Sequence, residues 1–240
     1  MSSASTATPE QLAELKKYTS CDISDALLRL KVPNSGFIAD LHLFPSSTPL
    51  ASPPSFDSVT VAPASTFLFI PKTLDAQDKS HGLPEGNIPS DSYWVDETQP
   101  GTIVVMSQPK GQINAVLGGI MAFRMKVRGA KGVVVSGRVR DMGELAQTEM
   151  PIWARATSTV GTGFGSVAHA MGIPLDIDGT IVKPGDIVFS DAREGVVVIP
   201  QEKLEEVLQL LPRLVKADDA VIESVKNGMP VKEAFAKYRG

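Results

Sequence analysis

The stretch TIVVMSQPKGQINAVLGGIMAFRMKVRGAKGVVV, residues 102–135, decides the fold that the sequence predicts. Residues 102–106 form a short apolar run after a Pro-Gly pair, which is typical of a buried strand. Residues 120–128 carry apolar side chains at helical spacing, and residues 132–135 form a second continuous apolar run. A strand, a helix and a strand in so short a segment predict a βαβ unit with parallel strands.

The helix predicted in this unit has two faces of different character. Ile120, Phe123 and Val127 share one face, whereas Arg124 and Arg128 share another. The glycine that follows this segment favours a helix end there.

Helices are predicted at both ends of the chain, with further strands between them. Residues 8–11 (TPEQ) have the pattern of a capping box with proline at the first helical position, and Ser20 and Asp22 can cap a second helix that runs through Leu30. Residues 45–57 and 71–92 are predicted to be loops. The remaining strands are predicted at residues 59–61, 67–70, 152–156, 186–190 and 195–199, and the remaining helices at residues 201–211, from Pro212 to Asn227, and from Pro230.

The bulk composition is that of an ordinary globular protein. The 240 residues are 42% hydrophobic and 21% charged, and the net charge of −4 argues against nucleic acid as a partner. The single cysteine excludes an internal disulfide and fits a cytoplasmic location, and we expect no membrane association because no long apolar run occurs. We expect residues 1–8 to form a disordered tail and residues 9–240 to form one domain.

Chemistry is expected where the βαβ unit brings two segments together. The turn before the helix, Gly118-Gly119, and the residues after the second strand meet at the carboxyl edge of the sheet, where ligands of open α/β sheets bind. Arg140 offers a planar fork for a carboxylate, and Asp141 is a hard oxygen ligand suited to Mg²⁺ or Mn²⁺. Glu144 is close enough to hold a metal-bound water. These residue types suit a small carboxylated substrate.

Simpler interpretations of the same residues remain open at this point. An Arg-Asp pair after a strand is often a surface salt bridge or a turn, and a Gly-Gly pair before a helix is often only a turn. Residues 161–166 (GTGFGS) weakly resemble a dinucleotide-binding loop, but the third glycine is a serine. Cys21 is expected to pack in a helix rather than act as a nucleophile.

Residues 118–145, GGIMAFRMKVRGAKGVVVSGRVRDMGEL, resemble the signature of the family shared by 4-hydroxy-4-methyl-2-oxoglutarate aldolases and the regulator of ribonuclease activity A. Class II pyruvate aldolases of that family carry an acidic residue, twenty further residues, an Arg-Asp pair and a nearby acid. In this chain twenty residues separate position 119 from Arg140, and Glu144 supplies the following acid. The similarity extends over about residues 10–235, including residues 20–27, 99–101, 184–186, 191 and 195–198.

The resemblance implies an α/β fold, a swivelling β/β/α core, that assembles as a homotrimer or a dimer of trimers with sites at the subunit interfaces. Asp141 would bind a divalent metal directly, Mg²⁺, Mn²⁺ or another, with Glu144 nearby. An acid from the C-terminal helix of a neighbouring subunit would also lie near the metal, and Asp219 is the candidate, with Asp218 as the alternative.

The same resemblance assigns the substrate-binding groups. Arg140 would hold the carboxylate and keto oxygen of pyruvate, next to Gly118, and the amides of Gly119, Ile120 and Met121 would hold the carboxylate. Arg140 and Asp141 would be the catalytic residues of a metal-dependent carbon–carbon lyase. It would release pyruvate, through an enolate that the metal stabilises, from oxaloacetate, from 4-hydroxy-4-methyl-2-oxoglutarate, or from both.

One position departs from the aldolase pattern. The acid that precedes the twenty-residue gap is Gly119 in this chain. Aldol cleavage must deprotonate a tertiary alcohol and therefore needs a base, whereas decarboxylation of oxaloacetate needs only a later proton. The sequence therefore favours decarboxylation over aldol cleavage. The alternative is a non-catalytic, protein-binding regulator like the ribonuclease-regulating branch, and a scaffold that binds a metabolite without turnover ranks lowest.

Overall fold

Strand β2 (Val59–Pro71) organises the sheet of this computed structural model, which describes residues 7–44, 59–76, 80 and 82–239. Its first part pairs antiparallel with β9, its middle pairs parallel with β3, and its last part pairs antiparallel with β6. The change of partner from β9 to β3 falls between Pro63 and Ala64. Proline lacks a backbone N–H and cannot serve two ladders, so it suits the point of exchange.

The main sheet has the order β1-β5-β4-β3-β2-β9-β10, with β6 added beside β2. The strands β2 to β5 run parallel to one another, and the outer pairs are antiparallel. The strands besides β2 are β1 (His42–Phe44), β3 (Ile103–Ser107), β4 (Gly132–Val139), β5 (Ile152–Thr157), β6 (Ser166–Met171), β9 (Ile187–Asp191), β10 (Gly195–Ile199) and the separate hairpin β7 (Leu175–Ile177) with β8 (Thr180–Val182).

The predicted α/β fold class is confirmed, including the central βαβ unit. The unit consists of β3, helix α3 (Gly119–Val127) and β4, whose parallel register starts with Ile103 opposite Gly132. The other helices are α1 (Pro9–Leu15), α2 (Ser20–Arg29), α4 (Met142–Gln147), α5 (Leu204–Lys226) and α6 (Val231–Tyr238). Short 3-10 turns lie at Pro33–Gly36, Trp94–Glu97, Thr162–Phe164 and Gln201–Lys203.

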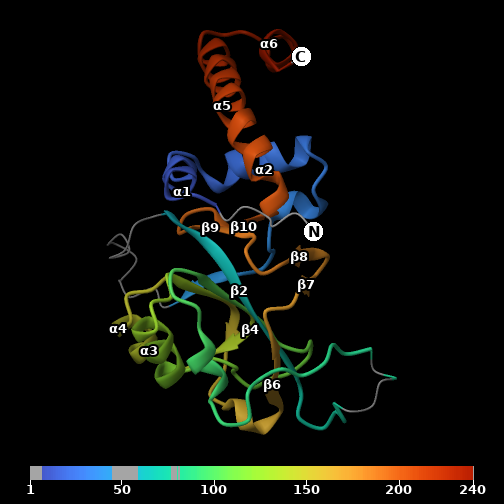
Figure 1. The fold of residues 1–240 in the computed structure, drawn as a ribbon. Helices are drawn as coiled ribbons and strands as arrows, with labels where there is room; N and C mark the ends of the chain where they lie inside the picture. Colours follow the sequence, from blue (N-terminus) through green and yellow to red (C-terminus); the bar gives the residue numbers. More distant parts are fainter. Residues whose placement is uncertain (1–6, 45–58, 77–79, 81, 240) are drawn as a thin grey trace.

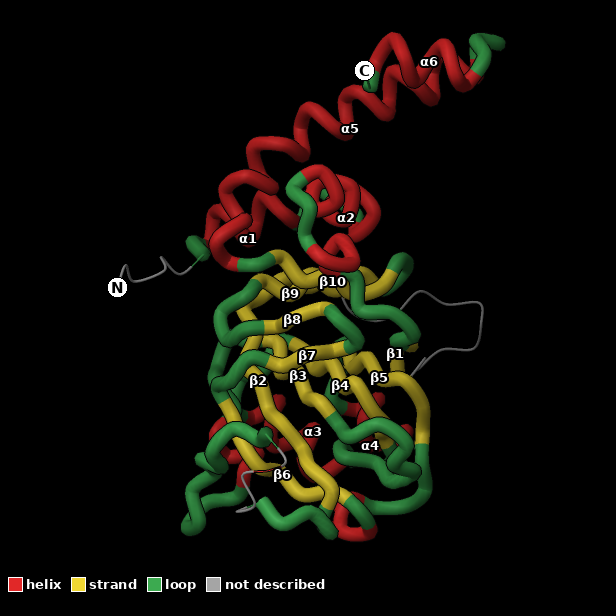
Figure 2. Tube along the Cα trace, turned by 90° about the vertical axis from the view of Figure 1, so that its right-hand side faces the viewer, coloured by secondary structure: helices red, strands yellow, loops and turns green. Residues whose placement is uncertain are grey.

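Helices cover the sheet in two separate places. Helices α3 and α4 lie against the β3–β4–β5 region, whereas α1, α2 and α5 sit over β9 and β10 at the other end, with α5 and α6 projecting from it (Figure 1). The β7–β8 hairpin lies in front of the sheet in Figure 2, with α3 and α4 behind it. No helix among the described residues is long and apolar enough to cross a membrane.

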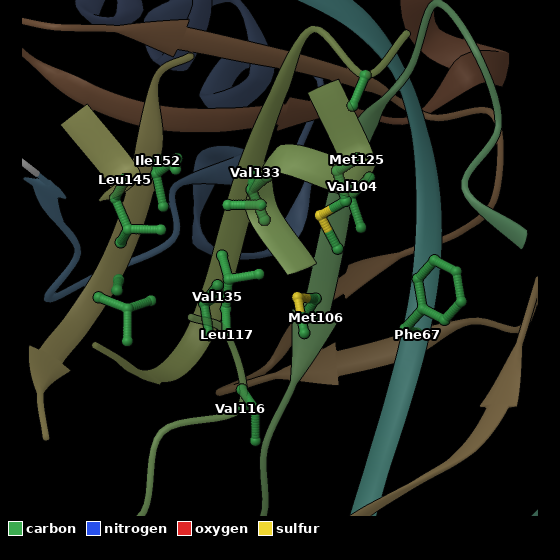
Figure 3. Packing of buried hydrophobic residues seen from close by; sticks show 14 of the residues in the cluster. Phe67, Val104, Met106, Val116, Leu117, Met125, Val133, Val135, Leu145 and Ile152 are labelled. Atoms are coloured by element: carbon green, nitrogen blue, oxygen red, sulfur yellow. The ribbon is translucent and has the colours of Figure 1, made fainter. Parts of the chain in front are cut away.

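Each helical layer has its own apolar core. Under α3 and α4, Val104, Met106, Val133 and Val135 of the strands pack with Met125 of α3 (Figure 3). At the other end the buried residues include leucines of all three helices, namely Leu15, Leu27, Leu204 and Leu211, together with Val207. A third cluster lies between the sheet and the β7–β8 hairpin.

The structure corrects several local expectations. The two strands predicted around residues 59–61 and 67–70 are one continuous strand. Helix α2 is capped by Thr19 rather than Ser20, and Asp22 completes a capping box by accepting from the Thr19 amide. Helix α5 continues through Pro212, because Leu211 and Leu214 are buried on either side and packing outweighs the lost hydrogen bond.

Helix α3 turns a different face toward the sheet than its apolar spacing suggests. The face with Ile120, Phe123 and Val127 is exposed, at 79%, 37% and 74%, and the buried residues are Gly119, Ala122 and Met125. Small and flexible side chains thus face the sheet. The exposed apolar face remains unpartnered in the isolated chain.

The helix predicted at residues 8–11 is confirmed, with Thr8 and Gln11 forming the capping box. Most of the predicted tail, residues 1–6, and the whole of the predicted 45–57 loop lie outside the described residues. The described residues of the predicted 71–92 loop contain no α-helix, and their strand content ends with Pro71.

Candidate active site

The predicted convergence of the Gly118-Gly119 turn and the Arg140-Asp141 pair is present. The segment before α3 runs alongside the end of β4, where Leu117 forms a parallel bridge with Val139 and its carbonyl accepts from the Arg140 amide at 3.0 Å. The Gly119 amide donates to Oδ2 of Asp141 at 3.0 Å. The sheet edge therefore brings the start of α3 and the start of α4 into direct contact.

Asp141 has an unusual backbone conformation for a residue with a side chain. Its φ of 61° and ψ of 53° lie in the left-handed region, which aspartate tolerates better than most residues. It precedes α4, yet its carboxylate does not cap that helix and instead reaches the amide of Gly119. Residues held in such sparsely populated conformations are concentrated at functional sites, which supports a role for this carboxylate.

Both glycines of the turn are required by close packing. A Cβ at position 118 would lie 2.5 Å from Asp141 Oδ2 and 3.2 Å from Arg140 Nε. A Cβ at position 119 would lie 2.4 Å from Cβ of Glu144. The Glu144 side chain therefore occupies the space into which an acid at position 119 would project, and the two positions cannot both carry an acidic side chain without a local shift.

Arg140 is held between its neighbour and a second glycine loop. Its Nε lies 3.5 Å from Asp141 Oδ2, and a Cβ at Gly161 would lie 2.8 Å from its Nη1. The surface salt bridge considered from the sequence thus exists, but the Arg140 side chain also lines a cavity. Gly161 of the GTGFGS segment packs against this guanidinium, whereas Gly165 packs against Asn114 and no atom lies within 4 Å of a Cβ at Gly163. This segment follows β5, which pairs parallel with β4, and that position could have indicated from the sequence that the segment lies near Arg140.

A cavity of about 270 Å³ contains these groups. Among the predicted residues, Gly118, Ile120, Met121, Arg140 and Asp141 line it, whereas Gly119 and Glu144 are not among its lining residues. Sequence reasoning missed the aromatic wall of Tyr93 and Trp94 and the loop residues Gly161, Thr162 and Gly163. No periodic pattern marked residues 93 and 94, which stand at the end of a long loop.

The amides at the start of α3 differ in their availability. The first-turn amides of a helix have no partner within the helix, so they can bind an anion. The Gly119 amide already donates to Asp141. The amides of Ile120 and Met121 are therefore the ones left to hold a substrate carboxylate.

The donor set fits a sparsely coordinated divalent metal. Asp141 offers its second carboxylate oxygen, and Glu144 stands beside Gly119 at the same edge. Mg²⁺ commonly takes one or two carboxylates and fills its remaining positions with water or substrate. Within the described part of the chain no three acidic, histidine or cysteine side chains gather into a metal-binding group. Asp219 lies on α5, at the opposite end of the molecule from α3 and α4 (Figure 1).

Comparison with known proteins places the chain in a family. The family model described as RraA-like, Aldolase/RraA, matches residues 20–198. The chain belongs to the RraA-like family. A protein of Halalkalibacterium halodurans named "Putative 4-hydroxy-4-methyl-2-oxoglutarate aldolase" is 28% identical over 142 residues, which cover 58% of this chain and 65% of that protein. Protein DlpA of Legionella pneumophila is 25% identical over 96% of this chain, but the match covers only 34% of DlpA.

Solved structures support the fold of this RraA-like protein. An uncharacterized protein of Pseudomonas syringae pv. tomato aligns with a TM-score of 0.72 at 22% identity, over 96% of this chain and 98% of its own. Streptomyces coelicolor RraAS2, described as an unusual member of the RNase ES inhibitor RraA protein family, aligns with a TM-score of 0.66 at 21% identity, over 94% and 99%. The chain spans less than two thirds of the length of the first curated relatives that it matches.

Proposed function

We propose that this protein is a divalent-metal-dependent lyase that releases pyruvate from 2-oxo acids, by oxaloacetate decarboxylation, by 4-hydroxy-4-methyl-2-oxoglutarate cleavage, or by both. The observation that carries the proposal is the Asp141 carboxylate. It is held in a left-handed backbone conformation, turned away from its own helix, and directed with Arg140 toward the start of α3. The family's named aldolases agree with this class of reaction.

The residues divide the chemical work between them. Asp141 is the proposed metal ligand, and a bound Mg²⁺ or Mn²⁺ would act as the Lewis acid that withdraws charge from the substrate's 2-oxo group. Arg140 and the amides of Ile120 and Met121 would hold the 2-oxo acid's carboxylate and orient it. Negative charge develops on the 2-oxo oxygen, so a contact from Arg140 to that oxygen would strengthen in the transition state and lower the barrier, whereas the contacts to the carboxylate would position the substrate.

Glu144 is the proposed proton-handling group. Its side chain fills the space that a Cβ at Gly119 would need, so it stands where the aldolase pattern places its first acid. The sequence favoured decarboxylation because position 119 carries no acid, but Glu144 is a candidate base beside that position. We therefore expect aldol cleavage as well as decarboxylation.

A second copy of the chain is proposed to complete the site. Asp219 belongs to α5, which lies at the opposite end of the molecule from α4 (Figure 1), and Asp141 precedes α4, so Asp219 would have to approach the metal from a neighbouring subunit. The exposed apolar face of α3, which starts beside the cavity, supports an interface there. A homotrimer or a dimer of trimers remains the proposed assembly.

Pyruvate release from each substrate, measured with Mg²⁺ and with EDTA, tests the proposal. We expect metal-dependent turnover in the natural protein and a large loss in Arg140→Ala. Arg138→Lys is the matched control, because Arg138 lies two residues earlier and bonds to the carbonyls of Gln112 and Thr157 rather than lining this cavity. Turnover unaffected by EDTA, or equal loss in both variants, would contradict the mechanism. Absence of turnover together with a stoichiometric ribonuclease complex would favour the regulator alternative.

A further inference from the structure

A second cavity adjoins the one that contains Arg140 and Asp141. It measures about 570 Å³, roughly twice the size of its neighbour at about 270 Å³. Tyr93, Trp94, Thr162 and Gly163 line both cavities. A ligand anchored at Arg140 would therefore have a continuous path past these residues into the larger space.

The wall of the second cavity is largely apolar and contains a fixed aromatic ring. Trp94 packs edge-on against Phe69, with ring centroids 5.2 Å apart, and against Phe67 at 5.4 Å. Phe69, Ile88 and Val167 also line the space. A wall whose rings are held by packing suits an apolar, planar group, because stacking costs little further loss of freedom.

One charged side chain stands at this cavity. Lys72 is the one formally charged residue among the described residues that line it. Its ammonium donates to the Gly163 carbonyl at 3.2 Å, and no ion pair is found for it in the described part of the chain. The exposed ammonium at the rim of this apolar cavity contacts a backbone carbonyl and could pair with an anionic ligand group.

Gly163 lines both cavities, and no atom lies within 4 Å of the position that a Cβ would take there. Lys72 donates to the carbonyl of this same residue, so the cation stands next to the residues that the two cavities share. The carboxylate anchor, the shared residues, the apolar wall and the second cation thus lie in two adjoining cavities.

We propose that the substrate of this site is a 4-hydroxy-2-oxo acid whose C4 substituent is an apolar, aromatic group ending in a carboxylate. The pyruvyl part lies at Arg140, the ring lies against Trp94 and the distal carboxylate meets Lys72. This inference rests on the proposed lyase function and adds the class of its substrate.

The reaction balances without a further reactant. A base removes the proton of the C4 hydroxyl, the C3–C4 bond breaks as the C4–O bond becomes a carbonyl, and the electron pair passes to C3. Protonation of C3 gives pyruvate. The other product is an aromatic aldehyde that carries the distal carboxylate.

Two matched probes test the second cavity. The first is 4-(4-carboxyphenyl)-4-hydroxy-2-oxobutanoate and the second is 4-phenyl-4-hydroxy-2-oxobutanoate, which lacks the distal charge. We expect the natural protein to cleave the first with a kcat/KM about tenfold higher than the second, as one favourable charge contact allows. Lys72→Met should abolish this ratio, and Lys72→Arg should keep most of it. Lys17→Met, on the distant α1 end, is the control and should leave the ratio unchanged.

The outcomes separate the inference from the proposed function. Turnover of oxaloacetate without cleavage of either aryl probe, or a ratio that Lys72→Met does not alter, would overturn the inference alone. If no substrate is turned over, the proposed function fails, and binding decides the inference. The non-cleavable 4-(4-carboxyphenyl)-2-oxobutanoate should then bind, in calorimetry, about tenfold more tightly than 4-phenyl-2-oxobutanoate, and equal affinities would overturn it.

Discussion

The two ends of this molecule hold their residues in place by different means. At the sheet edge near α3 and α4, glycines allow close contacts among charged groups, and Asp141 adopts a left-handed conformation. At the opposite end α1, α2 and α5 bury leucines over β9 and β10, and charged pairs such as Lys17–Glu14 remain on the surface. The end near α3 and α4 depends on a few specific contacts, whereas the helical end depends on many similar apolar contacts. Substitutions should therefore affect activity at one end and stability at the other.

The largest effect is expected from Asp141→Asn. Asparagine tolerates the left-handed conformation and can still accept from the Gly119 amide, so the change removes charge and little else. We expect kcat/KM for oxaloacetate to fall by about 10³-fold, or about 4 kcal/mol. Steady-state kinetics measure this loss, and thermal unfolding should show a melting temperature close to that of the natural protein. A stable variant with full activity would remove Asp141 from the mechanism.

Leu211→Ala should produce the opposite result. Leu211 is fully buried in α5 against the other helices of its end. Truncation of such a leucine costs about 2–5 kcal/mol of the free energy of unfolding, which urea denaturation measures. The kcat/KM of the folded fraction should be unchanged. A strong loss of activity in folded Leu211→Ala protein would show that substitutions at the helical end also affect activity.

Gly119→Asp examines the contact between positions 119 and 144. The added side chain meets Cβ of Glu144, so the single variant should lose activity by about 30-fold, or about 2 kcal/mol, rather than gain a base. Gly119→Asp combined with Glu144→Gly, which removes the Cβ at position 144, should recover much of that loss. Kinetics on oxaloacetate and on 4-hydroxy-4-methyl-2-oxoglutarate decide the matter. A double variant no better than the single one would mean that Glu144 and an acid at 119 are not equivalent.

Asp219→Asn examines whether the two ends meet between copies of the chain. We expect a loss of about tenfold in kcat/KM, smaller than for Asp141 because water can replace a distant carboxylate. Asp219→Asn and Asp141→Asn proteins, mixed and reassembled, should form some sites with both natural carboxylates, about a quarter in random trimers. No regain of activity on mixing would count against a shared site. Asp218→Asn tests the alternative candidate, and Glu205→Gln, an exposed acid in the first turn of α5, is the control.

The smallest effect is expected from Cys21→Ala. Cys21 is exposed on α2, contrary to the expectation that it packs, so its removal should change stability by less than about 0.5 kcal/mol and leave activity intact. Partial burial and the nearby Glu194 raise the pKa of its thiol. Alkylation should therefore be slow near neutral pH and accelerate as the pH rises. Fast alkylation at neutral pH would contradict this.

The sequence predicted the parts of the fold that rest on local periodicity. The apolar runs at residues 102–106 and 132–135 became β3 and β4, and the predicted meeting of Gly118-Gly119 with Arg140-Asp141 followed from parallel strands alone. Strands β1 and β6 were missed because they pair with distant segments. Strands β7 and β8 pair with each other across Asp178-Gly179, and this local hairpin signal was overlooked.

The sequence predicted the site residues that lie in or directly after the βαβ unit, and it missed those that other segments of the chain contribute. Residues 161–163 follow the end of β5, whereas Tyr93 and Trp94 stand at the end of a long loop where no local sequence pattern indicates the contact. The role of Gly161 became visible only with the Arg140 side chain in place. The exposed side of α3 was equally hidden, since the same apolar spacing describes a buried face and an interface.

Strand β2 has a consequence for how the molecule could be divided. Val61 packs in the helical end, Ala62 and Ala64 pack beneath the β7–β8 hairpin, and Phe67 and Phe69 pack in the layer under α3. A cut or insertion at Pro63 would separate one strand into two pieces that each lack an essential partner. Fragments made there should not fold alone, and hydrogen exchange along β2 should occur through a single global opening. Circular permutation should succeed elsewhere on the surface and fail at this strand.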